Sequence, residues 1–157
     1  MKKSAGLLLY RLTCKTPEFF LVHPGGPFFS KKNEGVWSIP KGIPEEDEQL
    51  MDTAQREFFE ETGITPIPPY HSLGTIKQKS GKVVHAWTFI GGWDPSDGIV
   101  SNMCQVEWPP RSKKMIDIPE IDRADWVDLT TARQLINVAQ IPFLLRAVEI
   151  YTLSKSI

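Results

Sequence analysis

Hydrophobic positions in the N-terminal part of the chain fall into short runs separated by polar and turn-forming residues. The runs "AGLLLYRLT" (5–13) and "FFLVHP" (19–24) predict two strands joined by a tight connection. Residues 23–35, "HPGGPFFSKKNEG", are rich in turn-forming types and predict a loop. The segment "VWSIP" (36–40) predicts a short strand that ends at its proline.

Residues 48–62 have helical spacing of their apolar positions. Leu50, Ala54 and Phe58 repeat every fourth residue, which places them on one buried stripe of a helix. Gly63 follows at the position where a helix C-cap belongs. This segment therefore predicts an amphipathic helix that ends sharply.

The middle of the chain alternates between strand-like and irregular segments. "HSLGTIKQ" (71–78) and "KVVHAWTFIGGW" (82–93) predict two strands around a turn at 80–81. The second is apolar on both faces, so we expect it inside a sheet. Residues 91–122 are rich in Gly, Pro, Asp and Ser, interrupted only by "CQVEW", and predict a long functional loop or lid.

The C-terminal part predicts a strand followed by helices. "DWVDL" (125–129) has strand character, and Thr130 or Thr131 is the expected cap of a brief helix. The apolar face of the final helix is expected to consist of Ile141, Leu144, Leu145 and Val148. Strands before, between and after helices predict an α/β fold with a mixed sheet and helices packed on it.

The composition is that of an ordinary globular chain of 157 residues, with 41% hydrophobic and 24% charged residues. This length suits a single domain, 1–157, with a substantial core. The formal net charge of −1 gives no overall attraction to nucleic acid or to an anionic membrane. A ligand that carries phosphate must therefore be bound by local groups or by a metal.

The cysteines and the N-terminal residues favour a cytoplasmic protein. Cys14 and Cys104 belong to no CxxC pair and are expected to be buried thiols in a reducing compartment. The apolar stretch of "MKKSAGLLLYR" is too short for a signal peptide and is interrupted by Arg11. No segment approaches the ~20 apolar residues of a membrane-spanning helix.

Three glutamates gather in the segment "REFFEETGI" (56–64). Glu57, Glu60 and Glu61 share one helix face, because positions three and four apart are neighbours on a helix. A solvated acidic face is the alternative on composition alone. The interleaved Phe58 and Phe59 and the helix end at Gly63 favour a partly buried cluster, which needs cations, and oxygen ligands suit Mg²⁺ or Mn²⁺.

The segment "GIPEEDEQLMDTAQREFFEETGI", residues 42–64, resembles the Nudix box with every fixed position occupied. The resemblance implies a Nudix-type α/β/α sandwich and an enzyme that hydrolyses a nucleoside diphosphate linked to another group. It also implies Mg²⁺ as the cofactor, with Mn²⁺ as an alternative. The metal would neutralise the diphosphate and activate an attacking water.

The resemblance also implies roles for individual residues. The carboxylates of Glu57, Glu60 and Glu61 would hold the metal ions, whose number stays open. Arg56 would orient a carboxylate, with Glu48 as its expected partner. The backbone carbonyl of Lys41 matches a metal ligand by position, and its ammonium is a candidate phosphate contact. Gly42 would allow the close backbone turn and is a further candidate substrate contact.

A further carboxylate is expected from outside the box, because Nudix enzymes commonly add a glutamate from a loop before a late strand that carries a tryptophan. Glu120 follows Pro119 and lies shortly before Trp126, so we favour it as a metal ligand or general base. Glu107 is its rival. If neither takes part, the base lies within the box, at Glu57 or Glu60.

Sequence marks of the substrate conflict. "WSIPKG" (37–42) resembles the corresponding segment of dinucleoside polyphosphate hydrolases, whereas the tyrosine that those enzymes often carry after the box is absent. Aromatic and cationic residues supply candidate contacts for a base and for phosphate, namely Trp37, Lys82, Trp108 and Arg111.

The leading hypothesis is a hydrolase of nucleoside or dinucleoside polyphosphates. A second hypothesis is a pyrophosphohydrolase of RNA 5′ ends, which the net charge of −1 disfavours mildly. A third, from a different class, is a nucleotide-binding regulatory module without catalysis. The complete set of box carboxylates argues against it. A small-molecule nucleotide partner is expected and a membrane is not, and the sequence leaves monomer or dimer open.

Overall fold

The computed structural model of the protein describes residues 2–13 and 16–155. The helices and strands, in chain order, are β1 (Lys3–Thr13), β2 (Thr16–Pro24), β3 (Lys41–Gly42), α1 (Leu50–Thr62), β4 (His71–Lys77), β5 (Val83–Ile90), η1 (Pro95–Asp97), β6 (Met103–Glu107), β7 (Met115–Pro119), β8 (Ile121–Asp128), α2 (Leu129–Leu135), η2 (Val138–Gln140) and α3 (Ile141–Lys155). Cys14, expected to be a buried thiol, lies outside the described residues.

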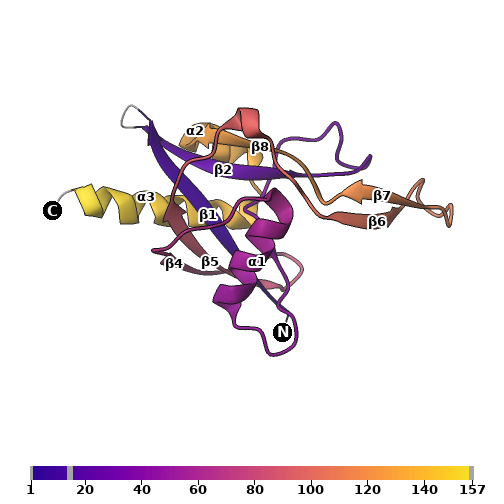
Figure 1. Cartoon of the computed structure of the whole chain (residues 1–157), viewed down its shortest axis with the longest axis horizontal. Coiled ribbons are helices and arrows are strands. Elements are labelled where there is room, and N and C mark those ends of the chain that lie inside the picture. Colours follow the sequence, from indigo (N-terminus) through magenta and orange to yellow (C-terminus); the bar gives the residue numbers. More distant parts are fainter. Residues whose placement is uncertain (1, 14–15, 156–157) are drawn as a thin grey trace.

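One mixed sheet forms the centre of the molecule (Figure 1). Its order is β4-β5-β1-β2-β8, and the short β3 pairs with β1. β1 and β5 run parallel, whereas the other paired strands of this sheet are antiparallel. The strands predicted within 5–24 and 71–93 are confirmed, and β5 lies inside the sheet as its apolar residues predict.

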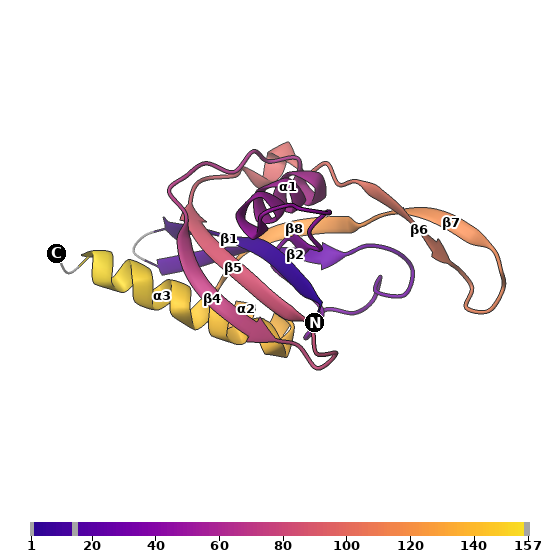
Figure 2. The same cartoon turned by 90° about the horizontal axis from the view of Figure 1, so that it is seen from below.

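Helices cover both faces of the sheet. Figure 2 shows α1 on one side and the pair α2 and α3 on the other. Alternate side chains of β1 serve the two layers, because successive strand residues point to opposite faces. Leu7 and Leu9 pack with Phe58 of α1, whereas Leu8 and Tyr10 join the core under α2 and α3. The predicted α/β/α architecture is confirmed.

α1 carries Arg56 and the three clustered glutamates on a well-defined helix. Its apolar stripe is buried, with Phe58 0% exposed. Gly63 ends the helix in the left-handed conformation, with φ of 78°, and its N–H donates to the Phe59 carbonyl at 2.7 Å. The helix begins at Leu50, slightly later than predicted, because Gln49 has an extended backbone.

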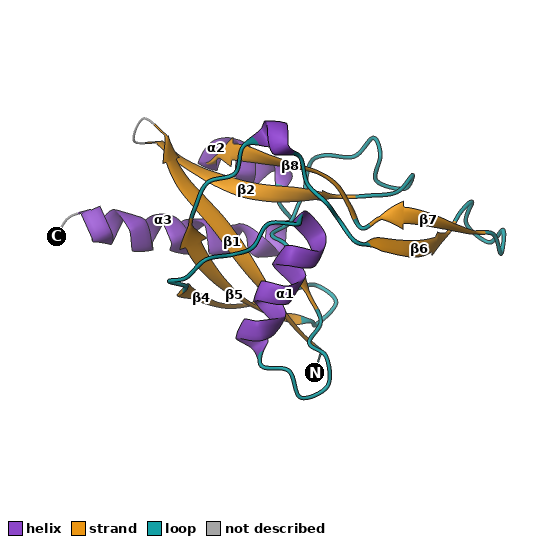
Figure 3. Ribbon diagram, in the orientation of Figure 1, coloured by secondary structure: helices purple, strands orange, loops and turns teal. Residues whose placement is uncertain are grey.

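The prediction of an irregular loop over 91–122 is wrong in its second half. There, β6 and β7 pair antiparallel from Met103 opposite Pro119 to Glu107 opposite Met115. This hairpin projects from the body of the molecule (Figure 1), whereas the segment between β5 and β6 is loop apart from η1 (Figure 3). The strands of a projecting ribbon are half exposed, so their composition is polar and resembles that of a loop.

Two shorter predictions also need correction. Residues 36–40 form only isolated bridges, and the strand begins after Pro40, where β3 pairs with β1. The helix α2 is capped by Asp128, whose carboxylate accepts from the Thr131 backbone N–H at 2.8 Å, rather than by Thr130 or Thr131. An aspartate at this position ends the strand and caps the helix at once.

The C-terminal helix α3 packs against the sheet mainly as predicted. Leu144 is buried together with Phe143 and Ala147, but Leu145 is 43% exposed because the next position on the helix turns away from the sheet. Neither α3 nor any other helix within the described residues is long and apolar enough to cross a membrane.

Candidate active site

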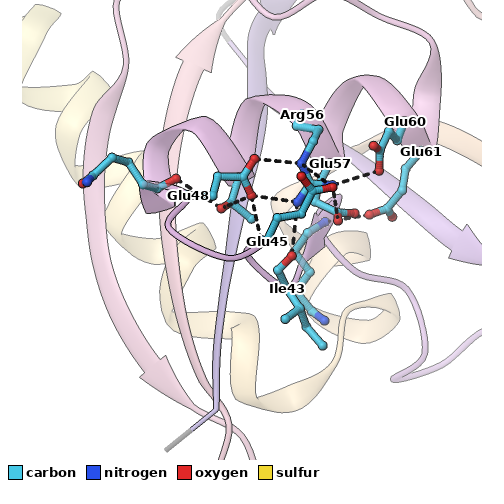
Figure 4. Close-up of polar contacts among 10 residues, drawn as sticks. Ile43, Glu45, Glu48, Arg56, Glu57, Glu60 and Glu61 are labelled. Carbon is cyan, nitrogen blue, oxygen red and sulfur yellow. Dashed lines mark hydrogen bonds and ion pairs between the residues drawn. The ribbon is translucent and has the colours of Figure 1, made fainter.

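Arg56 lies at the centre of a carboxylate network on α1 (Figure 4). Its Nε and Nη2 each lie 2.8 Å from an oxygen of Glu48, a two-pronged contact. Its Nη1 donates to Glu57 at 3.0 Å and to Glu60 at 3.1 Å. Nη2 also donates to the Ile43 carbonyl at 3.2 Å. The planar guanidinium thus holds three carboxylates in fixed positions.

Glu48 is the anchor of this network, as the sequence predicts for the partner of Arg56. It also accepts from Thr53 Oγ1 at 2.7 Å and from the Glu45 backbone N–H at 3.0 Å. The hydrogen bonds from Arg56 lower the pKa of Glu48 to about 2. Glu48 therefore stays ionised at neutral pH and fixes the orientation of Arg56.

A second cluster consists of Glu57, Glu61 and Glu120. One carboxylate oxygen from each lies within 4.8 Å of the others, with Glu57 and Glu61 buried and Glu120 half buried. Burial, followed by the charges of Glu120 and Glu57, raises the pKa of Glu61 well above its ordinary value. Burial also raises the pKa of Glu57, although Arg56 opposes this shift. The cluster therefore holds more negative charge than its protein surroundings compensate.

The short strand β3 brings the helix and the sheet into contact at this cluster. The Lys41 backbone N–H donates to Glu61 Oε2 at 3.0 Å. The carboxyl group of Glu57 lies directly over Gly42, where even a Cβ would overlap it. A glycine is therefore required here by close approach, and it lets α1 rest on the end of the sheet.

Glu120 reaches the cluster because its backbone is tied on both sides. Its N–H donates to the Asn102 carbonyl, and its carbonyl accepts from the Gly25 N–H, both at 2.9 Å. Glu107, the rival from sequence, accepts from the backbone N–H groups of Arg111 and Lys113 at 3.0 and 3.2 Å. In the structure Glu120 therefore lies beside the box carboxylates, whereas Glu107 stabilises the turn of the β6–β7 hairpin.

Glu60 has a different position from that of its neighbours on α1. The sequence predicts it together with Glu57 and Glu61, but it lies outside the group of three and pairs with Arg56. Its side chain is 36% exposed and lines the cleft in front of the cluster. The rotation between successive helix positions separates Glu60 from the two buried carboxylates.

The cleft beside these carboxylates has a volume of about 350 Å³. Lys41, Gly42 and Lys82, all predicted substrate contacts, line it. Burial and the charge of Lys82 lower the pKa of Lys41. Ser4 and Asn102 also line the cleft, and the sequence indicates neither, because their place depends on which distant strands pair.

The aromatic substrate contacts predicted from sequence lie elsewhere. Trp37 is only 5% exposed and packs in the core beneath α2 and α3, apart from the residues that line the cleft. The apolar character of a segment predicts that its residues are buried but does not predict the face of the sheet on which they pack. Trp108 lines a separate apolar pocket of about 230 Å³ with Phe28 and Phe29, and Arg111 lies in the hairpin turn.

The donor set of the cluster fits a hard divalent cation. Three carboxylates converge from α1 and from the residue between β7 and β8, and two of them are buried with raised pKa values. Mg²⁺ prefers oxygen ligands and binds through few carboxylates, so Glu57, Glu61 and Glu120 are the residues that would hold it. Lys41, whose backbone carbonyl is predicted as a metal ligand, contacts Glu61 through its backbone N–H.

Arg56→Ala is expected to lower kcat by roughly 10- to 100-fold with a smaller change in KM, because misplaced catalytic carboxylates cost rate rather than affinity. Arg56→Lys keeps the charge without the planar fork and should be intermediate. Steady-state kinetics with and without excess Mg²⁺ measures both. A rise in KM at unchanged kcat would instead make Arg56 a substrate contact.

The metal-free protein is expected to become less stable as pH rises above about 4.5. The folded-state pKa of Glu61 is raised, so the folded chain binds this proton more tightly than the unfolded chain, and stability falls as pH rises toward that raised pKa. Glu48 has the opposite effect on stability, and at lower pH. Its lowered pKa stabilises the folded chain at neutral pH, and this stabilisation is lost as pH falls toward about 2.

Glu61→Gln should remove most of this fall and raise Tm at pH 7 by at least about 2 °C in the presence of a chelator. Thermal melts of the wild type and the variant between pH 5 and 8 measure the difference between their Tm values. The histidines are the same in both proteins, so their contribution to the pH dependence cancels in this difference. Identical slopes in the two proteins would contradict the assignment of Glu61 as an uncompensated buried acid.

Comparison with known protein families gives one match over most of the chain. The NUDIX domain family model matches residues 3–146. A human protein, "Nucleoside diphosphate-linked moiety X motif 6", is 30% identical over 110 residues, which are 70% of this chain and 31% of that protein. The "mRNA-decapping protein g5R" of African swine fever virus is 63% identical over 30 residues, 19% of this chain and 12% of that protein. The chain thus spans less than a third of the length of these relatives.

Solved structures share the architecture over the full length. The binary complex of an Ap4A hydrolase from C. elegans superposes with a TM-score of 0.65 at 22% identity. The superposition covers 98% of this chain and 99% of the nematode protein. An identity this low shows the common fold alone.

Proposed function

Because the chain belongs to the Nudix family, whose domain model matches residues 3–146, we propose that it is a Mg²⁺-dependent pyrophosphohydrolase. Its substrate would be a nucleoside or dinucleoside polyphosphate. The observation that carries this proposal is the convergence of Glu57, Glu61 and Glu120 within 4.8 Å beside a cleft lined by two lysines. Acidic groups for a metal and basic groups for phosphate thus face one space.

Hydrolysis of a phosphoanhydride adds the oxygen of water to phosphorus and breaks one P–O bond. A bound Mg²⁺ would neutralise phosphate charge and make water a better nucleophile. The chain's own residues position the reactants. Arg56 keeps Glu57 aimed at the cleft, and the ammonium groups of Lys41 and Lys82 contact phosphate oxygens.

The proton released by the attacking water needs an acceptor in the cleft. We assign it to the carboxylate oxygen of Glu120 that would not bind the metal, because this side chain is half buried and lines the cleft beside the cluster. Its backbone ties to Asn102 and Gly25 keep it in place. A group that accepts a proton repeatedly must keep its position between turnovers.

A second candidate substrate is the 5′ end of RNA. The observation that favours it is the identity of 63% over 30 residues with a viral protein named for mRNA decapping. Lys77 and Lys79 are exposed and line a separate cleft together with Ser80, which also lines the cleft that contains Lys82. A regulatory module without catalysis is disfavoured, because Glu57, Glu60 and Glu61 are all present.

The test is a panel of nucleotides incubated with Mg²⁺, with detection of phosphate and pyrophosphate and chromatographic identification of the nucleotide products. The chromatography is needed because hydrolysis of a diadenosine polyphosphate or of ADP-ribose gives two phosphorylated products and neither free ion. The panel includes nucleoside triphosphates, diadenosine polyphosphates, ADP-ribose and a 5′-triphosphorylated oligoribonucleotide. We expect hydrolysis of the polyphosphates, abolished by chelator, and the products identify the bond that is cut. Activity that survives exhaustive chelation would overturn the proposal. We also propose that the protein is cytoplasmic.

A further inference from the structure

One end of the sheet carries lysines and no carboxylates. Residues 2–13, 65–93 and 129–148 contain no Asp or Glu, although the whole chain has 19 of them. Parts of all three segments meet around the turn between β4 and β5, beside which the N-terminus lies (Figure 2). The Lys2 carbonyl accepts from the Val83 N–H at 3.0 Å, which fixes this arrangement. The formal net charge of −1 therefore coexists with a local surface of positive charge.

Two open clefts follow one another around this turn. The first has a volume of about 550 Å³ and is lined by Lys2 and residues 80–82. The second has a volume of about 660 Å³ and lies between residues 77–80 and residues 137–139. The two clefts share Ser80, and the first shares Lys82 with the carboxylate cleft. The three clefts therefore adjoin one another in a row that starts at the carboxylates.

The lysines along this row have no counterion in the protein. Within the described part of the chain, no carboxylate oxygen lies within 4.0 Å of the ammonium of Lys2, Lys77 or Lys79. All three side chains are exposed, and Lys82 between them is half buried. Four ammonium groups without internal partners form a surface that attracts a polyanion.

The spacing of the lysines suits an extended chain of phosphates. Lys41 of β3 and Lys77 of β4 are separated by β1 and β5, so three strand spacings of about 4.8 Å place their Cα atoms at least roughly 14 Å apart. A diphosphate at the carboxylate cluster is too short to contact both. Successive phosphates of a nucleic acid strand carry charge over such a distance.

The polar groups of the second cleft fit a ribose-phosphate backbone. Gln78, Ser80 and Asn137 line this cleft together with the lysines. Amide and hydroxyl groups of this kind bond to phosphate oxygens and to the 2′-hydroxyl of ribose. The row is also concave, which suits a strand that lies in it and not the flat surface of a membrane.

We propose that the lysines around the β4–β5 turn, Lys2, Lys77 and Lys79, form a binding surface for a single strand of RNA whose 5′ end lies at the carboxylates. The inference deepens the RNA candidate of the proposed function and rests on that function for the position of the 5′ end. The strand leaves the carboxylate cleft past Lys82. Its binding needs no metal, because the ammonium groups contact its phosphates directly.

The binding test is fluorescence anisotropy with a labelled 5′-hydroxyl oligouridylate in chelator, so that neither metal nor turnover takes part. For four phosphate contacts, the slope of log K against log salt should be about −3, since each contact on a single strand contributes about −0.7. The double variant Lys77→Gln/Lys79→Gln should bind at least about 10-fold more weakly at low salt, with the slope smaller by about 1.4. The matched control Lys113→Gln/Lys114→Gln removes the same charge from exposed positions of the β6–β7 turn and should bind as the wild type does.

Three outcomes would overturn the surface. Binding without salt dependence would exclude phosphate contacts, and equal losses in the two double variants would show only an effect of overall charge. A Tm of Lys77→Gln/Lys79→Gln below that of the wild type would show a structural role for lysines that are exposed and unpaired. Vesicles of phosphatidylcholine with phosphatidylserine form a second probe, and binding to these vesicles but not to the oligouridylate would assign the surface to a membrane instead.

Kinetics then connects the surface with the substrate. The ratio of kcat/KM for a 5′-triphosphorylated oligoribonucleotide to that for ATP should fall at least about 5-fold in Lys77→Gln/Lys79→Gln, through a higher KM for the RNA. An unchanged ratio would overturn the part of the surface in substrate binding. If the wild type hydrolyses neither compound, the proposed function fails, whereas the metal-free binding result still decides the surface.

Discussion

Glu61→Gln is expected to lower kcat by at least ~100-fold, equivalent to about 2.7 kcal/mol of activation free energy. The substitution removes one negative charge from the carboxylate cluster that would bind the cation. The fold should persist, because the amide oxygen can still accept the Lys41 backbone N–H that now bonds to Glu61 Oε2 at 3.0 Å. Turnover in saturating Mg²⁺, circular dichroism and titration of Mg²⁺ measure the three effects.

Glu46→Gln is the matched control, because it makes the same change of charge at an exposed loop position before α1. It should keep wild-type turnover and metal affinity. Near-wild-type turnover of Glu61→Gln in saturating Mg²⁺ would refute the metal site at this cluster. The same conclusion would follow if Glu61→Gln bound Mg²⁺ as tightly as the wild type does.

The second large effect is expected from Glu120→Gln, with a loss of kcat of about 100-fold and a flattened acidic limb of the pH profile. Glutamine keeps the size of the side chain but accepts no proton. Its backbone bonds to Asn102 and Gly25 do not involve the side chain, so the loop should stay in place. The pH dependence of kcat and kcat/KM gives the readout.

Glu107→Gln provides the comparison, because Glu107 ends β6 of the neighbouring hairpin and is the alternative that the sequence offers. Its carboxylate accepts from the backbone of Arg111 and Lys113, so substitution should affect the turn and leave the pH profile unchanged. If both variants keep the acidic limb, the proton acceptor lies within the box, at Glu57 or Glu60.

The carboxylates of α1 can be predicted from sequence because helical spacing is a local property. Glu57 and Glu61 are four residues apart and share a face wherever a helix forms. Gly63 marks the end of that helix through its left-handed conformation. Glu120 can be predicted only through the family resemblance, because it reaches the cluster by long-range contacts with Asn102 and Gly25.

The remaining features depend on which distant segments pair. Ser4 belongs to an apolar strand, and only the register of β1 against β3 places it beside Lys41. Trp37 precedes the box closely in sequence, but its side chain is buried in the core under α2 and α3, on the other face of the sheet from α1. The β6–β7 hairpin is half exposed, so its sequence lacks the apolar run that marks a buried strand.

The parallel pairing of β1 with β5 also determines when the site can form during folding. Leu8 and Thr88 are partners across these strands although 80 residues separate them in the chain. Closing so long a loop costs entropy before any contact repays it, which makes such pairings slow. The carboxylate cluster needs β3, α1 and the start of β8 on this same sheet. A partly folded chain with α1 already helical therefore still lacks the metal site, and recovery of Mg²⁺ binding should mark the last step of refolding.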